Sequence, residues 1–458
     1  MIQDSSNPLH HRFPSSFLGI RPERYSYSPR LSTSSSTMSS LLGLTYDVAL
    51  KLMEWLDVRS LSSLDVAATN LIERPRWLSY LAAMQKSDAL NKWIFYDSAA
   101  SWLSKRAICP RNLHSANSHQ KLFSEIDISE LQSITIGSKD PRCYRNITDS
   151  DLNFALRCPN LVVVCLNYCR LITDVGVATI ARACPRLLSI SLCATNVTDV
   201  GMRILSEGCN ALNTINIDHT EASDEGLSFI SSGCPQLVSI SLVDCCAVTF
   251  VGINALAEGC PLLQSIVLDG LDKITDAGIR SIGNRCPQLH SISLNGCRGI
   301  RFPGMNAVAN GCPLLQSISM DGCCWVTDES LKALGIGCPN LHHISVNHSK
   351  VTDSILLVIS ARCPNLQSIS LDECASVSDI GVGAIIRECT GLRSISLNYT
   401  NVTDDVVYGI IDTCPALLSI KLDGCQNVTD AALAALGRGP NKLLTIVSDR
   451  QNSFFKAM

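Results

Sequence analysis

Charged residues are scarce in this chain of 458 residues: Asp, Glu, Lys and Arg make up 17% of it, and the net charge is −4. This weakly acidic balance provides no electrostatic attraction for a nucleic acid or an anionic membrane surface. No apolar run is long enough to span a bilayer, and the first segment lacks the apolar stretch of a secretory signal. We therefore expect neither a nucleic-acid partner nor a membrane partner.

Catalytic motifs are also missing. The sequence contains no glycine-rich phosphate loop, no HExxH zinc motif and no nucleophile elbow. Its scattered histidines and cysteines form no nucleophile–base pair at a supporting spacing. We expect that the protein is not an enzyme and that it uses no cofactor and no metal.

CxxC pairs are absent although the chain has 23 cysteines, which argues against a zinc ribbon. Many cysteines recur instead at steps of 25 or 26 residues, at positions 158, 184, 209, 234, 260, 286, 312, 338, 363, 389 and 414. Equivalent cysteines in stacked repeats would form a column of small, buried side chains with reduced thiols. Reduced thiols indicate the cytoplasm or the nucleus.

Residues 414–439 show the repeating unit in its most regular form, CPALLSIKLDGCQNVTDAALAALGRG. Its first half alternates apolar and polar residues, as a half-buried strand does, and its second half has helical spacing. Thr429 is predicted to cap the helix, and Asp430 suits the positive end of the helix dipole. One unit buries its apolar face only when it is stacked on copies of itself.

The consensus CPxLxSISLxxCxxVTDxGxxAL resembles the cysteine-containing class of leucine-rich repeat. The resemblance covers most of the chain and recurs in register. It implies an α/β solenoid, a horseshoe with one parallel β-sheet on its concave face and short helices on its convex face. About twelve repeats are expected over residues 128–439, followed by a C-terminal cap over residues 440–458.

The residues ahead of the repeats differ in character. Residues 1–40 are rich in Ser, Pro and Arg and read as a disordered tail, with a transit peptide as the alternative. Residues 41–83 carry apolar residues at steps of three and four, which predicts two short helices. Residues 84–127 contain an aromatic cluster and are expected to form a helical connector, or N-terminal cap.

The helical region 41–83 resembles an F-box, although Thr45 stands where the family has Pro. The resemblance implies a substrate-recognition subunit of a Skp–cullin–F-box ubiquitin ligase, which binds a target protein for ubiquitin-dependent degradation. The residues that would contact the Skp-type adaptor are Leu44, Val48, Leu52, Trp55, Leu56 and Leu61. Two alternatives remain open: a helical cap for the solenoid, and a non-catalytic scaffold or inhibitor that binds a protein without ubiquitin transfer.

A row of Asp and Asn residues is expected beside the serines on the concave face. One interpretation is that this row offers acceptors to a basic or amide-rich protein partner. The other is that serine and asparagine side chains satisfy each other along the stacked strands. The row comprises Asp218, Asp269, Asn295, Asp321, Asn347, Asp372, Asn398 and Asp423.

Interruptions of the repeat are the second candidate for partner binding. The Thr-Asp pair is replaced at Phe250 and at Arg301-Phe302, and Trp325 lies in the next unit. Exposed aromatic residues beside an arginine are typical of interface hot spots. The alternative is that these side chains fold inward and fill gaps. A second set on or near the strand face comprises Tyr168, His219, His342, His343, His348 and Tyr399.

Overall fold

The computed structural model describes residues 95–96, 112–115, 128–129, 131–136, 147–323, 325–438 and 445–447. All of these belong to one compact unit, Asn91–Met458, and the other unit is Met1–Leu90. The expected tail 1–40 and the F-box-like region 41–83, with its six candidate adaptor-binding residues, lie outside the described residues.

Fifteen short strands form one parallel sheet in the order of the sequence. Neighbouring strands pair in register, so that Ile318 lies between Ile292 and Ile344. The strands are β1 (Phe95–Tyr96), β2 (Asn112–Ser115), β3 (Ser133–Ile136), β4 (Val163–Cys165), β5 (Ser189–Ser191), β6 (Thr214–Asn216), β7 (Ser239–Ser241), β8 (Ser265–Val267), β9 (Ser291–Ser293), β10 (Ser317–Ser319), β11 (His343–Ser345), β12 (Ser368–Ser370), β13 (Ser394–Ser396), β14 (Ser419–Lys421) and β15 (Thr445–Val447).

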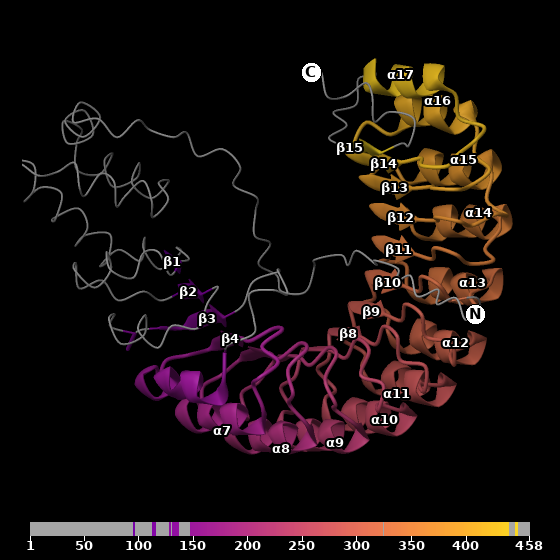
Figure 1. The fold of residues 1–458 in the computed structure, drawn as a ribbon. Helices are drawn as coiled ribbons and strands as arrows, with labels where there is room; N and C mark the ends of the chain where they lie inside the picture. Colours follow the sequence, from indigo (N-terminus) through magenta and orange to yellow (C-terminus); the bar gives the residue numbers. More distant parts are fainter. Residues whose placement is uncertain are drawn as a thin grey trace, which may run out of the picture. The chain divides into compact units, whose positions relative to one another are not determined.

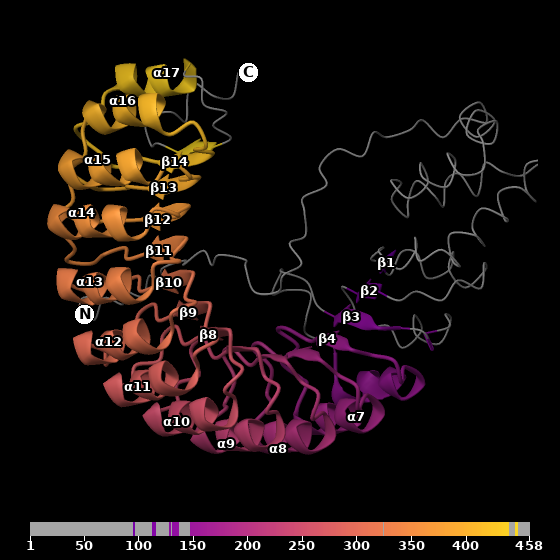
Figure 2. The ribbon, with the colours of Figure 1, turned by 180° about the vertical axis from the view of Figure 1, so that it is seen from behind.

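From β3 onward, one helical segment follows each strand up to β14. The segments are η4 (Asp149–Arg157), a 3-10 helix, and α7 (Asp174–Ala183), α8 (Asp199–Gly208), α9 (Asp224–Gly233), α10 (Phe250–Gly259), α11 (Asp276–Arg285), α12 (Phe302–Gly311), α13 (Asp328–Gly337), α14 (Asp353–Arg362), α15 (Asp379–Glu388), α16 (Asp404–Thr413) and α17 (Asp430–Arg438). In Figures 1 and 2 the strands line the inner side of the arc that these repeats form, and the helices lie on its outer side. The predicted α/β solenoid is therefore confirmed.

The sheet begins earlier than the repeat pattern indicates. β1 and β2 lie within the segment 84–127, for which the sequence predicts a helical connector, and both pair parallel to the strands that follow. The rest of that segment lies outside the described residues. Strand β15 likewise extends the sheet into the expected C-terminal cap.

Each repeat contributes the same apolar positions to a continuous core. In the repeat of β9, Cys286, Leu289, Ile292 and Leu294 are all buried. Full burial of a Leu or Ile side chain stabilises a fold by about 1.5–3 kcal/mol. Because each of these side chains packs against its equivalents in the neighbouring repeats, the stacking is the source of the core.

The cysteines form two buried columns. In the column that begins each repeat, the Sγ of Cys338 donates to the carbonyl oxygen of Cys312 at 3.4 Å. In the column that follows the strands, the Sγ of Cys297 donates to the carbonyl oxygen of Leu268 at 3.0 Å. Burial raises the pKa of the Cys312 and Cys338 thiols to about 12. Every described cysteine is a free thiol, and all except Cys165 and Cys246 are buried, as the sequence predicts.

Candidate protein-interaction surfaces

The Asp/Asn row on the concave side connects most of the described repeats to the next. The Oδ1 of Asn295 accepts the hydroxyl of Ser319 at 2.7 Å and the backbone N–H of Asp321 at 2.7 Å. The Oδ1 of Asp321 accepts the equivalent donors of the following repeat, Ser345 at 2.6 Å and Asn347 at 2.9 Å. We call this row the inner ladder; its acceptors in the described residues are Asn167, Asp218, Asp269, Asn295, Asp321, Asn347, Asp372 and Asn398.

Asp and Asn alternate along the later part of the inner ladder, from Asp269 to Asp423. The alternation keeps two carboxylates from occupying neighbouring strands, which in a sheet lie about 4.8 Å apart. It also lets an amide donate to a carboxylate: Asn295 Nδ2 lies 3.1 Å from Asp269 Oδ2, and Asn398 Nδ2 lies 3.1 Å from Asp372 Oδ2. The pattern therefore has a structural reason in addition to any role in binding.

Burial raises the pKa of the Asp269 carboxyl above its ordinary value, and the charge of Asp321 contributes in the same direction. Hydrogen bonds from Ser293 and Asn295 oppose this effect. The inner ladder is thus half-buried and internally bonded through Oδ1. This geometry agrees with the interpretation that these side chains satisfy each other along the strands.

The inner ladder is interrupted where Val243 occupies the Asp/Asn position. The valine side chain accepts no hydrogen bond. A serine as the last residue of the next strand, which elsewhere donates to the Asp or Asn side chain, would therefore lack its acceptor. That position holds Val267, which is 5% exposed. The two substitutions therefore compensate each other and leave an apolar spot on the strand face.

One residue of each repeat, directly after the ladder position, adopts a positive φ. It is glycine at positions 270, 296, 322 and 424, but it carries a side chain at Tyr168, Ala194, His219, Asp244, His348, Glu373 and Tyr399. Left-handed backbone is uncommon for residues other than glycine and costs free energy. The sequence patterns single out Tyr168, His219, His348 and Tyr399 but miss Asp244 and Glu373, because a periodicity shows no φ angle.

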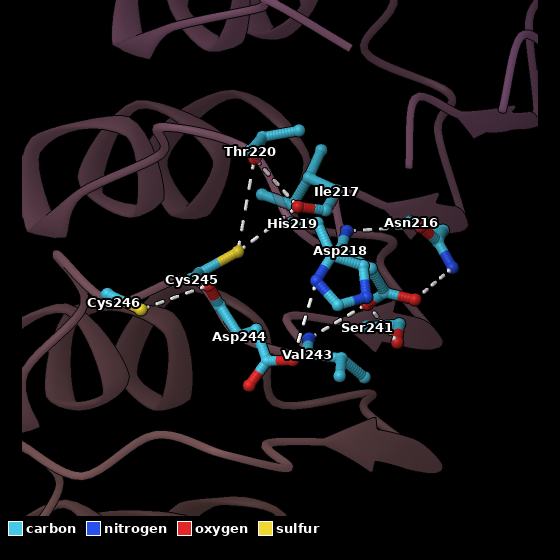
Figure 3. A network of polar contacts seen from close by, with 10 residues as sticks. All are labelled: Asn216, Ile217, Asp218, His219, Thr220, Ser241, Val243, Asp244, Cys245 and Cys246. Atoms are coloured by element: carbon cyan, nitrogen blue, oxygen red, sulfur yellow. Dashed lines mark hydrogen bonds and ion pairs between the residues drawn. The ribbon is translucent and has the colours of Figure 1, made fainter. Parts of the chain in front are cut away.

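Two ion pairs join neighbouring members of this left-handed column. His219 Nδ1 lies 3.4 Å from Asp244 Oδ2, and His348 Nδ1 lies 2.9 Å from Glu373 Oε2. Figure 3 shows the first pair beside the bonds of Asp218 to Ser241 and Val243. All four side chains of the pairs are at least one-third exposed, so each pair contributes little to stability.

His342 and His343 are half-buried near the start of β11. Burial lowers the pKa of His343, and the neighbouring carboxylate of Asp321 works against this effect. The two histidines belong to different positions from those of His219 and His348. The structure therefore divides the second candidate set among three repeat positions: the positive-φ column, that of His342 and that of His343.

A second ladder runs along the starts of the helices. The first helical residue of most repeats is an aspartate whose two oxygens accept the N–H and the hydroxyl of the capping residue in the next repeat. Asp224, for example, accepts the N–H of Thr249 at 2.8 Å, its hydroxyl at 2.6 Å and the N–H of Gly252 at 2.9 Å. We call this row the helix-start ladder; its acceptors are Asp149, Asp174, Asp199, Asp224, Asp276, Asp328, Asp353, Asp379 and Asp404.

Phe250 and Phe302 replace the aspartate of this ladder, and both side chains are exposed, by 44% and 39%. Arg301, the capping residue of α12, is exposed beside Phe302. The structure therefore brings these three candidates to the same edge of the solenoid, with the intact repeat of α11 between the two phenylalanines. The alternative in which they fold inward does not hold for them.

Trp325 behaves differently. Its indole Nε1 donates to the carbonyl oxygen of Cys297 at 2.6 Å, and the side chain is half-buried. The tryptophan thus closes the loop of its own repeat onto the preceding one. For Trp325 the geometry agrees with the gap-filling interpretation.

The described residues were compared with two kinds of functional element, a metal site and a membrane-spanning helix, and contain neither. Those residues hold no group of three or more His, Cys, Asp or Glu side chains placed to bind a metal ion. Within the same part of the chain, no helix has the length and apolar character needed to cross a membrane.

Comparisons with known proteins bear on the fold. No known protein-family model matches the chain, and no curated protein matches it either. Among solved structures, it is similar to one reported as Rad7 and Elc1 complex in yeast, with 16% identity, a TM-score of 0.50 and coverage of 90% of this chain and 88% of that chain. An internalin, InlF of Listeria monocytogenes, has 16% identity and a TM-score of 0.44 over 66% of this chain and 88% of that chain. The described repeats thus have a leucine-rich-repeat-like fold.

Proposed function

We propose that the protein is a substrate-recognition subunit of a Skp–cullin–F-box type ubiquitin ligase and that its repeats bind the target protein. The observation that carries the proposal is the edge formed by Phe250, Arg301 and Phe302. Large aromatic residues and arginine are enriched among the residues that dominate binding energies at protein interfaces. These three are exposed on a scaffold whose other described repeats carry Ser or Thr followed by Asp at the same two positions.

The scaffold suits this task because its two ladders connect most of the described repeats to the next, although neither ladder crosses the junction that follows Val243 and Phe250. A rigid surface loses little conformational freedom on binding, so more of the contact energy appears as affinity. The inner ladder adds acceptors for a basic or amide-rich partner, since Asp321 Oδ2 accepts no hydrogen bond from the described residues. The protein would position its target and supply no bond chemistry.

The adaptor would be bound by the F-box-like region through Leu44, Val48, Leu52, Trp55, Leu56 and Leu61. Rad7, to which the chain is similar in fold, was crystallised in complex with Elc1. A solenoid of this kind is therefore compatible with a stable complex with a second protein. The free thiols of the described repeats suit the reducing cytoplasm or nucleus, where such ligases act.

Co-expression of the full chain with a Skp-type adaptor and a cullin tests this function. The adaptor is expected to co-purify with the full chain, and the double change Leu52→Asp and Leu56→Asp is expected to abolish co-purification. Phe302→Ala serves as the matched control, because it changes the repeat edge and leaves the F-box-like region intact. Failure of the unmodified chain to retain the adaptor would overturn the ligase function.

A non-catalytic scaffold or inhibitor is the second candidate. It is favoured by Thr45, which occupies the position of the family's proline. In this case the repeats bind a protein, but neither adaptor binding nor ubiquitin transfer to the bound protein is observed. Ubiquitin transfer in a reconstituted ligase separates the two functions.

A further inference from the structure

The start of helix α13 lacks the carboxylate that the other repeats provide. Thr327 caps this helix, and its counterparts in intact repeats donate their N–H and hydroxyl to the aspartate of the preceding helix. The residue at that place in the preceding helix is Phe302. Among the described residues, Thr327 therefore finds no acceptor of this kind, and its side chain makes no hydrogen bond to its own helix.

The open cap is accessible. Thr327 is exposed, and so is Thr275, which follows the other interruption at Phe250. The capping residues Thr249 and Thr352, which are bonded to an aspartate of the preceding repeat, are half-buried. The capping group of Thr327 thus faces solvent. The phenylalanine at the interruption does not shield it.

Ser330 adds a buried polar group that points toward the same place. It is fully buried, and its Oγ has no hydrogen-bond partner. The equivalent residue in most other repeats is glycine, and a Cβ added to Gly304 or Gly381 would meet the ladder Oδ1 of Asp276 at 2.7 Å or Asp353 at 2.5 Å. The side chain of Ser330 is therefore directed at the position that the ladder carboxylate occupies elsewhere.

We infer that the start of α13 receives an acidic side chain of the bound protein. Thr327 holds it at the surface, the buried Ser330 Oγ is reached when the exposed Phe302 side chain moves aside, and Phe302 and Arg301 contact the residues beside it. This inference rests on the proposed role of the repeats in protein binding and specifies the chemistry of the partner. A carboxylate there would complete the helix-start ladder in trans. It would also meet the positive end of the helix dipole.

Charge favours a carboxylate over a doubly charged phosphate. Asp328 and Glu329 lie in the first turn of α13, and their negative charges oppose an incoming anion. In the intact helix-start ladder, however, the carboxylate of each repeat lies beside the aspartate of the next repeat, as Asp149 does beside Asp174. The start of a helix in this fold therefore accepts one carboxylate despite its own acidic residue. The exposed guanidinium of Arg301 provides a nearby positive charge that offsets the opposition.

The other interruption differs in a way that makes it a useful comparison. At Phe250 the following helix, α11, has Gly278 in the place of Ser330, and a Cβ there would meet Phe250 Cα and Ile253 Cβ at 3.3 Å. That site offers the open cap of Thr275 but no buried hydroxyl. We therefore place the acidic residue at α13.

Selection of random 12-residue peptides displayed on phage against the full chain tests the inference. Selected peptides are expected to share an Asp or Glu whose change to Asn or Gln weakens binding roughly tenfold or more, since a hydrogen bond to a charged group is worth about 1.5–3 kcal/mol. Phe302→Asp is expected to weaken binding similarly, because the chain then supplies its own carboxylate to Thr327. Ser330→Gly, which introduces the residue of most other repeats, is expected to weaken it several-fold.

Val200→Asp is the matched control, since Val200 is an exposed residue at the start of α8, where the ladder is intact. It adds the same charge to the same edge and should leave binding unchanged. Two outcomes would overturn the inference. Either no selected peptide depends on Phe302 and Ser330 for binding, or the selected peptides bind without an acidic residue. A phosphoserine version that binds more tightly than the Asp peptide would also contradict it. Adaptor co-purification is measured independently, so the ligase function stands or falls separately.

Discussion

Asn295 and Asp321 lie in neighbouring repeats, and the side-chain Oδ1 of Asn295 accepts the backbone N–H of Asp321 at 2.7 Å. The same oxygen accepts the hydroxyl of Ser319 at 2.7 Å. A single side chain thus satisfies two donors of the following strand. Repeated along the sheet, this contact holds the strand ends together on the concave side.

Asn295→Leu should therefore destabilise the repeats. The leucine removes the acceptor for the Asp321 N–H and the Ser319 hydroxyl, and an unsatisfied buried donor costs about 1–3 kcal/mol. Urea unfolding followed by circular dichroism measures the change. Asn401→Leu is the control: Asn401 is exposed, donates a single bond to Ala375, and its replacement should cost about 0.5 kcal/mol or less. Equal effects of the two changes would contradict the role of the inner ladder.

The stability of the repeats should depend on pH through Asp269. Burial raises the pKa of this carboxyl above its ordinary value in the folded state. A carboxyl with a raised folded pKa contributes stability below its unfolded pKa, and that contribution is lost as the pH rises through the folded pKa. Asp269→Asn removes this term and keeps an Oδ1 acceptor for Ser293 and Asn295.

The native chain should therefore lose stability relative to Asp269→Asn as the pH rises from about 4 to about 7, and the difference in their free energies of unfolding measures this loss. Urea unfolding of both proteins at several pH values measures it. Asp412→Asn is the control, because Asp412 is an exposed carboxyl near the end of α16 for which the described residues provide no ion-pair partner. A difference for Asp269→Asn that stays constant or moves the other way over this range would contradict the raised pKa.

The thiols should react very unequally in the folded protein. Cys246 is exposed, whereas Cys323 is buried and its pKa is raised to about 12. Because the thiolate is the reactive form, a buried thiol of high pKa reacts slowly with a disulfide reagent. Cys246→Ser is expected to remove one rapidly reacting thiol, and Cys323→Ser is expected to remove none. In denaturant, each variant should show one thiol fewer than the native chain, and a shortfall beyond that would reveal disulfides.

The sequence by itself determined the repeat, its strand and its helix. Steps of 25 or 26 residues, alternation before the ladder position and helical spacing after Thr-Asp are local features, so no tertiary contact is needed to recognise them. The same pattern predicts which face is concave. It also identifies Phe250, Arg301 and Phe302 as departures from the rule.

The tertiary structure decided what the polar residues contact, because their partners lie a full repeat away. Asp149 and Thr173 are separated by 24 residues, yet their side chains are 2.6 Å apart. The spacing of Thr429 and Asp430 predicts a cap and a dipole contact, whereas the aspartates of the helix-start ladder accept hydrogen bonds from the next repeat. Likewise, Trp325 turns inward to the Cys297 carbonyl while Phe302 stays exposed. Only the stacking of the repeats distinguishes these two aromatic residues, since it places the carbonyl oxygen of Cys297 beside Trp325.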